Sequence, residues 1–215
     1  MAMTTKVKIC GLKTQVALDA AFAGGADYVG LVFFPPSPRN VAPAAARALA
    51  DKARGRAKIV ALMVDPDDAL IDTVVASAAP DLLQLHGEET PERAADIRSR
   101  WGRPVMKAIK VETGEDARAA LRYRAAADLI LFDARAPTDS TRPGGNGAPF
   151  DWRTLLGVKD QVPFMLSGGL TPDNVAEAIR ATGAVIVDVS SGVESSPGDK
   201  DPELIRRFLR AAKGG

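Results

Sequence analysis

"PFMLSGGLTPDNVAEAIRATGAVIVDVS", residues 163–190, contains two short apolar runs with one helical segment between them. The runs PFMLSGG (163–169) and AVIVDVS (184–190) have the composition that is typical of buried strands. The segment between them has helical periodicity, and Pro172 stands where a first helical turn would begin. A strand, a helix and a second strand in this order predict a βαβ unit with parallel strands.

The same alternation continues along the chain from residue 6 to residue 213. Pro91 is expected in the first turn of one helix, and a final helix is predicted near Pro202 to Lys213. The six further strand-like runs are VKIC (7–10), YVGLVF (28–33), KIVALMV (58–64), LLQLH (82–86), VMKAIKV (105–111) and DLILFDA (128–134). Eight such units in 215 residues favour a closed (β/α)8 barrel, with residues 1–215 as a single domain. An open doubly wound sheet is the alternative fold.

The composition argues against polyanionic partners, because 28 Lys and Arg nearly balance 27 Asp and Glu. Neither nucleic acid nor an anionic membrane is expected as a partner, so the ligand should be a small molecule. The single cysteine, Cys10, cannot form an internal disulfide, and no apolar run approaches the ~20 residues that cross a bilayer. Residues 1–10 lack the apolar core of a signal peptide, so we expect a cytoplasmic protein.

One connection, ARAPTDSTRPGGNGAPFDW (134–152), is rich in Gly and Pro and long for a loop between a strand and a helix. We expect a mobile loop at the active site. The alternative is a surface insertion without a function.

Side-chain parity indicates which residues face the inside of the barrel. Outward faces pack on helices and must be apolar, so polar residues of one parity mark the inward face. In the first strand, Val7 and Ile9 share one parity, whereas Lys8 and Cys10 share the other. The other inward-facing polar residues found near strand ends are Gln84, His86, Asp133, Asp188 and Ser190. Because barrel enzymes carry their chemistry at the carboxyl ends of the strands, Cys10, His86, Asp133 and Asp188 are candidate site residues.

Each of these four residues also has a structural interpretation. Cys10 could be a small buried apolar residue, and His86 a hydrogen-bonded structural histidine. Asp133 could cap the turn that follows its strand. For Asp188, between Val187 and Val189, we favour a satisfied internal carboxylate that positions its neighbours.

A phosphate-binding region is predicted where two glycine-containing stretches follow neighbouring strands, LSGGL (166–170) and VSSGVES (189–195). Glycine lets backbone N–H groups approach an anion, and barrels often bind phosphate after strands seven and eight. The candidate residues are Gly168, Gly169, Ser190, Ser191 and Gly192. The sequence has no P-loop signature and no Cys/His cluster with metal spacing, so we expect chemistry without a metal or cofactor.

Several motifs occur in the order typical of one family: KICGLKT, GLVFFPPSPRNV, LQLHGEE, LFDA, GGNGAPFDW, FMLSGGLTPDNV and VDVSSGVESSPGDKD. Nearly the whole chain resembles phosphoribosylanthranilate isomerase, a ribulose-phosphate-binding barrel. The resemblance implies an aldose–ketose isomerase of tryptophan biosynthesis. The implied reaction is the Amadori rearrangement of N-(5-phosphoribosyl)anthranilate to 1-(2-carboxyphenylamino)-1-deoxyribulose 5-phosphate.

The resemblance also implies roles for individual residues. Asp133 matches the general acid that protonates the ring oxygen, and Cys10 matches the general base that removes the C2 proton. Arg39 matches the residue that binds the anthranilate carboxylate, and His86 matches a histidine at the rim without an assigned role. The long loop departs from the usual GGTGKT, with Asn146 and Ala148, so no side-chain role is carried over there.

The expected chemistry is physically reasonable for these residues. An acid on the sixth strand and a base on the first can reach one sugar from two sides, and the acid must be protonated at neutral pH. We hypothesise that Lys8, one layer below Cys10, favours the thiolate. Arg39 can grip a carboxylate with its planar fork, although a solvated surface arginine is the alternative.

Three other functions are considered. Indole-glycerol-phosphate synthase carries an extension before its first strand, and the histidine-pathway isomerase resembles a duplicated half-barrel with an aspartate in place of the first-strand cysteine. Neither feature is found in this sequence. A non-catalytic barrel that binds a phosphorylated metabolite is the third, and the presence of both Cys10 and Asp133 argues against it. The sequence leaves open whether the protein is a monomer or a homodimer.

Overall fold

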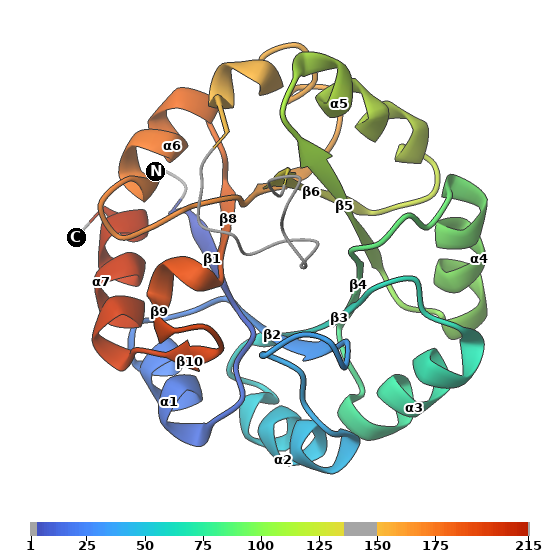
Figure 1. The fold of residues 1–215 in the computed structure, drawn as a ribbon, viewed down its shortest axis with the longest axis vertical. Helices are drawn as coiled ribbons and strands as arrows, with labels where there is room; N and C mark the ends of the chain where they lie inside the picture. Colours follow the sequence, from blue (N-terminus) through green and yellow to red (C-terminus); the bar gives the residue numbers. More distant parts are fainter. Residues whose placement is uncertain (1–3, 136–149, 215) are drawn as a thin grey trace.

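Eight parallel strands close into a barrel in chain order in the computed structural model, which describes residues 4–135 and 150–214 (Figure 1). The strands are β1 (Lys6–Cys10), β2 (Tyr28–Phe33), β3 (Lys58–Met63), β4 (Leu82–Leu85), β5 (Val105–Val111), β6 (Leu129–Ala134), β7 (Phe164–Leu166) and β8 (Ile186–Val189). Strand β1 pairs with both β2 and β8, which closes the barrel. The predicted (β/α)8 barrel is therefore confirmed, and the open sheet is wrong. Most of the predicted mobile loop lies at residues 136–149, outside the described residues.

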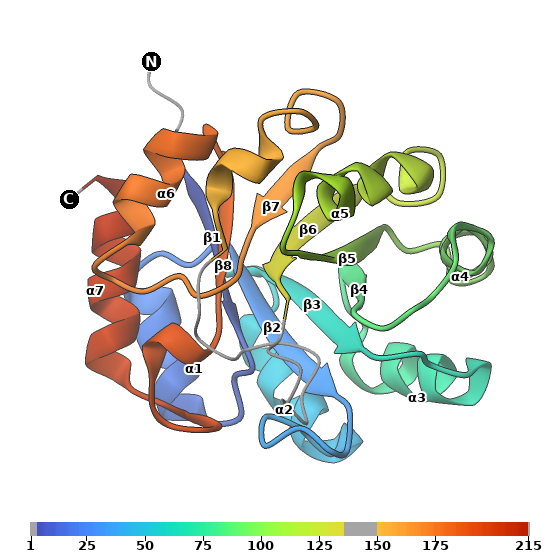
Figure 2. The ribbon, with the colours of Figure 1, turned by 45° about the horizontal axis from the view of Figure 1, so that its top comes forward.

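Helices form a ring around the strands (Figures 1 and 2). They are α1 (Gln15–Ala23), α2 (Pro43–Ala53), α3 (Asp68–Ala78), α4 (Pro91–Trp101), α5 (Gly114–Arg118), α6 (Val175–Thr182) and α7 (Pro202–Lys213), with 3-10 turns η1 (Ala119–Tyr123), η2 (Trp152–Leu155) and η3 (Ser191–Val193). No helix within residues 4–135 and 150–214 combines the length and hydropathy needed to cross a membrane.

Proline marks two of the three helix starts that the sequence predicts. Helix α4 begins at Pro91 after the Thr90 cap, and α7 occupies the predicted range from Pro202. The prediction for Pro172 is wrong, because α6 begins at Val175. Pro172 lies in a turn that the Asn174 side chain closes by accepting a hydrogen bond from the Thr171 backbone and donating one to the Gly169 carbonyl. The turn satisfies these polar groups without a further helical turn.

The strand residues divide into an outward-facing and an inward-facing set, as the parity argument predicts. Val7 and Ile9 belong to the outer core between strands and helices. Inside the barrel, an apolar cluster is formed by Tyr28, Val60, Leu82, Met106, Ala108, Leu131 and Met165. Lys8 is level with Tyr28 and Asp188 in the strand register, and Cys10 lies two residues further toward the carboxyl end. The polar inward side chains therefore gather at the carboxyl-terminal end of the barrel.

A two-stranded antiparallel hairpin, β9 (Glu194–Ser196) and β10 (Asp199–Lys200), follows β8 and η3. The sequence analysis does not predict it, because its Ser/Pro/Gly composition is typical of a loop. Gly198 has φ +90°, and a Cβ there would lie 2.7 Å from the Pro38 carbonyl oxygen. The hairpin therefore packs against the loop that follows β2.

We expect Phe208→Ala to lower the free energy of unfolding by about 3–5 kcal/mol, because it leaves a cavity in the outer core. Phe208 is completely buried in α7, which packs against α1, α6 and β1. Val16→Ala is the matched control, because Val16 is 65% exposed and should change stability by less than about 0.5 kcal/mol. Urea denaturation of both variants measures the difference. Equal effects would contradict the assignment of α7 to the core.

Candidate active site

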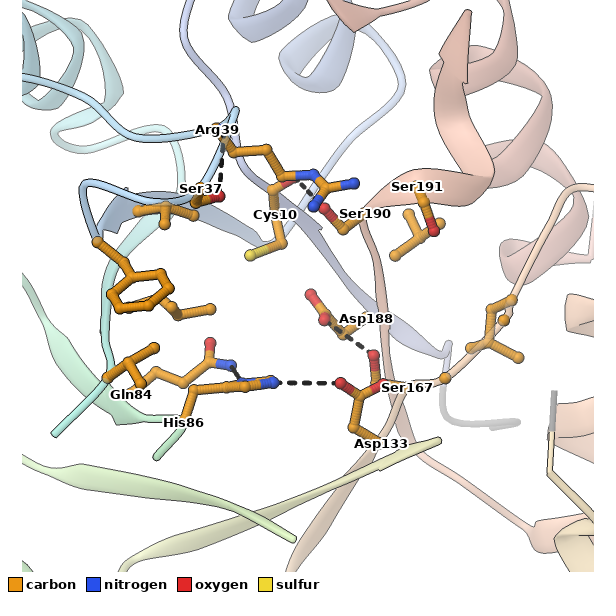
Figure 3. Close-up of a pocket in the computed structure, with 18 of the residues that line it drawn as sticks. Cys10, Ser37, Arg39, Gln84, His86, Asp133, Ser167, Asp188, Ser190 and Ser191 are labelled. Carbon is orange, nitrogen blue, oxygen red and sulfur yellow. Dashed lines mark hydrogen bonds and ion pairs between the residues drawn. The ribbon is translucent and has the colours of Figure 1, made fainter. Parts of the chain in front are cut away.

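A cavity opens at the carboxyl-terminal end of the barrel and encloses about 800 Å³ when its open mouth is included (Figure 3). This volume lies in the range of small-molecule sites. Of the predicted site residues, those that line it are Cys10, Arg39, His86, Asp133, Gly168, Gly169, Asp188, Ser190 and Ser191. Gly192 does not line the cavity. A Cβ at Gly192 would lie 1.9 Å from the Leu170 carbonyl oxygen, so this glycine lets the segments after β7 and β8 meet.

The base of the site is a buried ion pair. Lys8 Nζ lies 2.8 Å from Asp188 Oδ1, and the Ser167 hydroxyl donates to Asp188 Oδ2 at 3.1 Å. Burial alone would lower the pKa of Lys8, but the Asp188 carboxylate outweighs burial and raises this pKa to about 12. Asp188 is therefore a satisfied carboxylate in contact with a permanent cation, in agreement with the interpretation that we favour from the sequence.

Cys10 ends β1, with only 3% of its surface exposed. A Cβ at Gly30, its register partner on β2, would lie 2.9 Å from the sulfur, so glycine leaves room for the thiol. Burial raises the pKa of Cys10 above its usual value, and Asp188 adds to this, whereas Lys8 and Lys200 lower it. Lys8 therefore acts in the direction that we hypothesise, but burial prevails and Cys10 is a neutral thiol at rest.

Asp133 and His86 lie side by side across the cavity from Cys10 (Figure 3). His86 Nε2 is 3.2 Å from Asp133 Oδ2, and Gln84 Nε2 is 3.1 Å from His86 Nδ1. If the Gln84 amide donates to Nδ1, the ring proton resides on Nε2 and points to the carboxylate. Asp133 Oδ1 also accepts a hydrogen bond from the Ala134 backbone N–H at 3.0 Å. This is the kind of local contact expected if Asp133 caps the turn after its strand.

Arg39 is buried, so the alternative of a solvated surface arginine is wrong. Its Nε and Nη2 donate to the two carboxylate oxygens of Glu194 at 2.7 and 2.8 Å. Lys200 Nζ donates to Glu194 Oε1 at 2.6 Å and to the Ser190 carbonyl and hydroxyl at 2.9 and 3.2 Å. We call Arg39, Glu194 and Lys200 the rim cluster.

The sequence analysis does not identify Glu194 and Lys200. Both lie in VESSPGDKD, where charged residues stand in a turn-like segment. Exposed charges are the usual content of such segments, so the only signal is their place next to the predicted phosphate-binding stretch. Their burial depends on the loop after β2, which lies about 155 residues away in the chain.

The glycines after β7 adopt left-handed conformations, with φ +85° at Gly168 and +65° at Gly169. A Cβ at Gly168 would lie 2.3 Å from the Ala134 backbone nitrogen. Among the described residues, neither glycine donates its backbone N–H to another group. Two N–H groups beside the cavity thus have no acceptor within residues 4–135 and 150–214, which suits them to bind an anion.

Metal-binding residues do not cluster in the described parts of the chain: no group of three or more His, Cys, Asp or Glu side chains there could hold a metal ion.

We expect the stability difference between the wild type and Glu194→Gln to shrink as pH falls from about 5 toward about 3. Burial alone would raise the pKa of Glu194, but Arg39 and Lys200 lower it from 4.5 to about 2. A pKa lowered by folding stabilises the protein above the unfolded value, and this stabilisation is lost as pH falls toward the folded value. Its full size is about 3 kcal/mol at most. Denaturation at several pH values measures it, and a difference independent of pH would contradict the ion-pair assignment.

Comparisons with known proteins identify the family of this chain. The family model for N-(5'-phosphoribosyl)anthranilate (PRA) isomerase matches residues 7–211. The N-(5'-phosphoribosyl)anthranilate isomerase of Rhodopseudomonas palustris (strain HaA2) is 59% identical over 211 residues, which cover 98% of this chain and 97% of the relative.

Two solved structures have the same architecture. Phosphoribosyl anthranilate isomerase from Thermotoga maritima is 37% identical, with a TM-score of 0.87 and coverage of 98% of this chain and 100% of the other. A phosphoribosyl anthranilate isomerase in complex with reduced 1-(o-carboxyphenylamino)-1-deoxyribulose 5-phosphate is 36% identical, with a TM-score of 0.84 and the same coverage. Because a family model and a close relative both match nearly the whole sequence, the chain belongs to the N-(5'-phosphoribosyl)anthranilate isomerase family.

Proposed function

We propose that Asp133 and Cys10 are the general acid and the general base with which this chain isomerises N-(5'-phosphoribosyl)anthranilate. The chain is an aldose–ketose isomerase of tryptophan biosynthesis, as its family membership establishes. The observation that supports the two roles is their position. One cavity is lined by a carboxyl group from β6 and a thiol from β1, and also by Arg39 and the Gly168–Gly169 segment.

In the first step, Asp133 donates a proton to the furanose ring oxygen while the bond between C1 and that oxygen breaks. The nitrogen lone pair forms a C1–N double bond, which leaves an iminium cation and the Asp133 carboxylate. His86 keeps the carboxyl group in place from 3.2 Å, and Gln84 fixes the orientation of the ring.

In the second step, the Cys10 thiol loses its proton to solvent at the mouth of the cavity, and the thiolate accepts the proton from C2 while the electrons of the C–H bond move toward the iminium to form an enolamine. The enolamine then tautomerises to the ketose. The cationic iminium makes the C2 proton more acidic, and the same positive charge favours the thiolate, together with Lys8 and Lys200. A thiol that is neutral at rest therefore acts as the base once it has released its proton to solvent, and solvent returns a proton to the Asp133 carboxylate at the end of the reaction. Both steps are proton transfers, which need no metal or cofactor.

The two anionic ends of the substrate are held at different parts of the rim. The backbone N–H groups of Gly168 and Gly169, and the segment Ser190–Gly192, bind the phosphate. Arg39 binds the anthranilate carboxylate through the part of its guanidinium group that Glu194 leaves unoccupied. Asp188 contributes indirectly, by holding Lys8 and Ser167 below the substrate.

We also infer the setting in which the enzyme acts. Residues 1–215 form a single domain, since the barrel and its helices use the chain from Lys6 to Lys213. The protein is cytoplasmic, because it acts on a phosphorylated biosynthetic intermediate, and it acts as a monomer or as a homodimer.

We expect Cys10→Ser and Asp133→Asn each to lower kcat by a factor of about 100 to 10,000, because each removes one proton-transfer group. The substrate is generated in situ, and its disappearance is followed by fluorescence. Circular dichroism confirms that both variants fold. Turnover that survives in folded Cys10→Ser would assign the base to another group, and a wild type that binds without converting the substrate would support the non-catalytic barrel.

We expect Gly192→Ala to weaken phosphate binding by a factor of about 10 or more, which corresponds to loss of one charge-assisted hydrogen bond. The added Cβ would lie 1.9 Å from the Leu170 carbonyl, so the two loops must separate. Gly157→Ala is the control, because no atom lies within 4 Å of the Cβ there. The measurement is the inhibition constant of inorganic phosphate, and equal constants in both variants would place the phosphate elsewhere.

A further inference from the structure

We propose that Glu194 and Lys200 are positioning residues, which hold Arg39 and Ser190 where they bind the two ends of the substrate. This inference rests on the proposed function and assigns roles to two residues of the β9–β10 hairpin. Neither residue lines the cavity, so each would act through its neighbour.

Glu194 determines how Arg39 presents its guanidinium group. A guanidinium group is planar and has its five N–H donors in a fixed fork. Both carboxylate oxygens of Glu194 accept from one edge of this fork, at Nε and Nη2. Because two parallel hydrogen bonds prevent rotation about the long side chain, the opposite edge, which includes Nη1, keeps a fixed direction. A second carboxylate can bind only at that remaining edge.

The chain also makes room for the Arg39 side chain at this place. Gly11, which follows β1, has φ +78°, and a Cβ there would lie 2.7 Å from Arg39 Cδ. Gly198 donates its backbone N–H to Glu194 Oε2 at 3.2 Å, which fixes the carboxylate from the hairpin side. Arg39 therefore contacts β1 and the hairpin, two elements that are far apart in the sequence.

Lys200 connects the same carboxylate to the proposed phosphate segment. An ammonium group has three donors, and Lys200 makes three contacts: Glu194 Oε1, the Ser190 carbonyl and the Ser190 hydroxyl. It therefore has no donor left for the substrate. Ser190 in turn donates its hydroxyl to the Cys10 carbonyl at 3.3 Å, which links the end of β8 to the end of β1.

The charge of the rim cluster favours a role in anion binding over a purely structural ion pair. Its side chains are only 7%, 4% and 2% exposed for Arg39, Glu194 and Lys200, and it contains two basic groups for one carboxylate. Burial lowers the pKa of Lys200, and Glu194 opposes this shift. The buried pair of Lys107 and Glu89, by contrast, has one basic group for one carboxylate. An excess buried charge is unfavourable in the unliganded protein, and an anionic ligand at Arg39 offsets it.

The test compares Glu194→Gln, Glu194→Asp and Lys200→Met with the wild type. Asp199→Asn is the matched control, because Asp199 lies in the same hairpin but its side chain is 68% exposed. Its ion pair with Lys13 is long, at 3.9 Å, and therefore weak. For each protein, kcat and KM are measured with N-(5'-phosphoribosyl)anthranilate. The inhibition constants of anthranilate and of inorganic phosphate are measured separately, since they report on the carboxylate and phosphate ends.

We expect Glu194→Gln to raise KM and the anthranilate constant by a factor of about 10 or more, as for loss of a charged hydrogen bond. The phosphate constant and kcat should change less than about threefold, because neither the glycine loops nor the reacting groups contact Glu194. Glu194→Asp should recover part of the loss, since it keeps the charge. Lys200→Met should raise the phosphate constant, whereas Asp199→Asn should change nothing.

The inference is wrong if folded Glu194→Gln keeps the wild-type KM, or if it only lowers the melting temperature. It is also wrong if Glu194→Gln raises the inhibition constants of anthranilate and of phosphate equally and lowers kcat as well. That pattern would indicate that the substitution disturbs the whole site and not the position of Arg39. If Glu194→Gln does not fold, Glu194→Asp and Lys200→Met decide by the same constants. The proposed function fails separately if Arg39→Ala leaves the anthranilate constant unchanged, or if the wild type does not convert the substrate.

Discussion

A strand in a closed barrel has only two directions for its side chains, outward to the helices or inward to the barrel interior. The inward side chains stack in layers, each contributed by alternate strands. In this protein an apolar cluster that includes Met106 and Met165 fills the barrel below the site. The polar side chains above this cluster have no space below them and cannot point outward into the helices. This constraint brings the thiol of Cys10, the imidazole of His86 and the carboxyl groups of Asp133 and Asp188 into one cavity.

The charged groups of the site form two sets, an ion pair at the base of the cavity and the rim cluster. Inside, the cation of Lys8 is matched by Asp188, so the pair adds little net charge beside the reacting groups. At the rim, Arg39 and Lys200 share the single carboxylate of Glu194. Burial raises the pKa of the Cys10 thiol, which lies apart from the rim cluster. The proposed function therefore assigns substrate binding and proton transfer to different groups.

The contacts that build the site join residues from opposite ends of the chain. Lys8 and Asp188 are 180 positions apart, as are Cys10 and Ser190, and Arg39 and Glu194 are 155 apart. They exist only when β1 pairs with β8, so the site is complete only when the barrel is closed. Such non-local contacts are lost together when the closure is disturbed. Helix α7, which packs against β1 and α1, supports that closure.

Local sequence pattern was sufficient to predict the strands and the glycines after β7. It also predicted the inward direction of Lys8, Cys10, His86, Asp133 and Asp188. These features depend on the period of a strand and on backbone sterics, which act within a few residues. The reaction was inferred from the resemblance of several motifs to one family. Tertiary structure alone decided that Arg39 is buried and that it pairs with Glu194, which also accepts from Lys200. The ionisation of Cys10 was also decided there, because desolvation and the fields of Lys8, Lys200 and Asp188 depend on distances in space, which no short stretch of sequence contains.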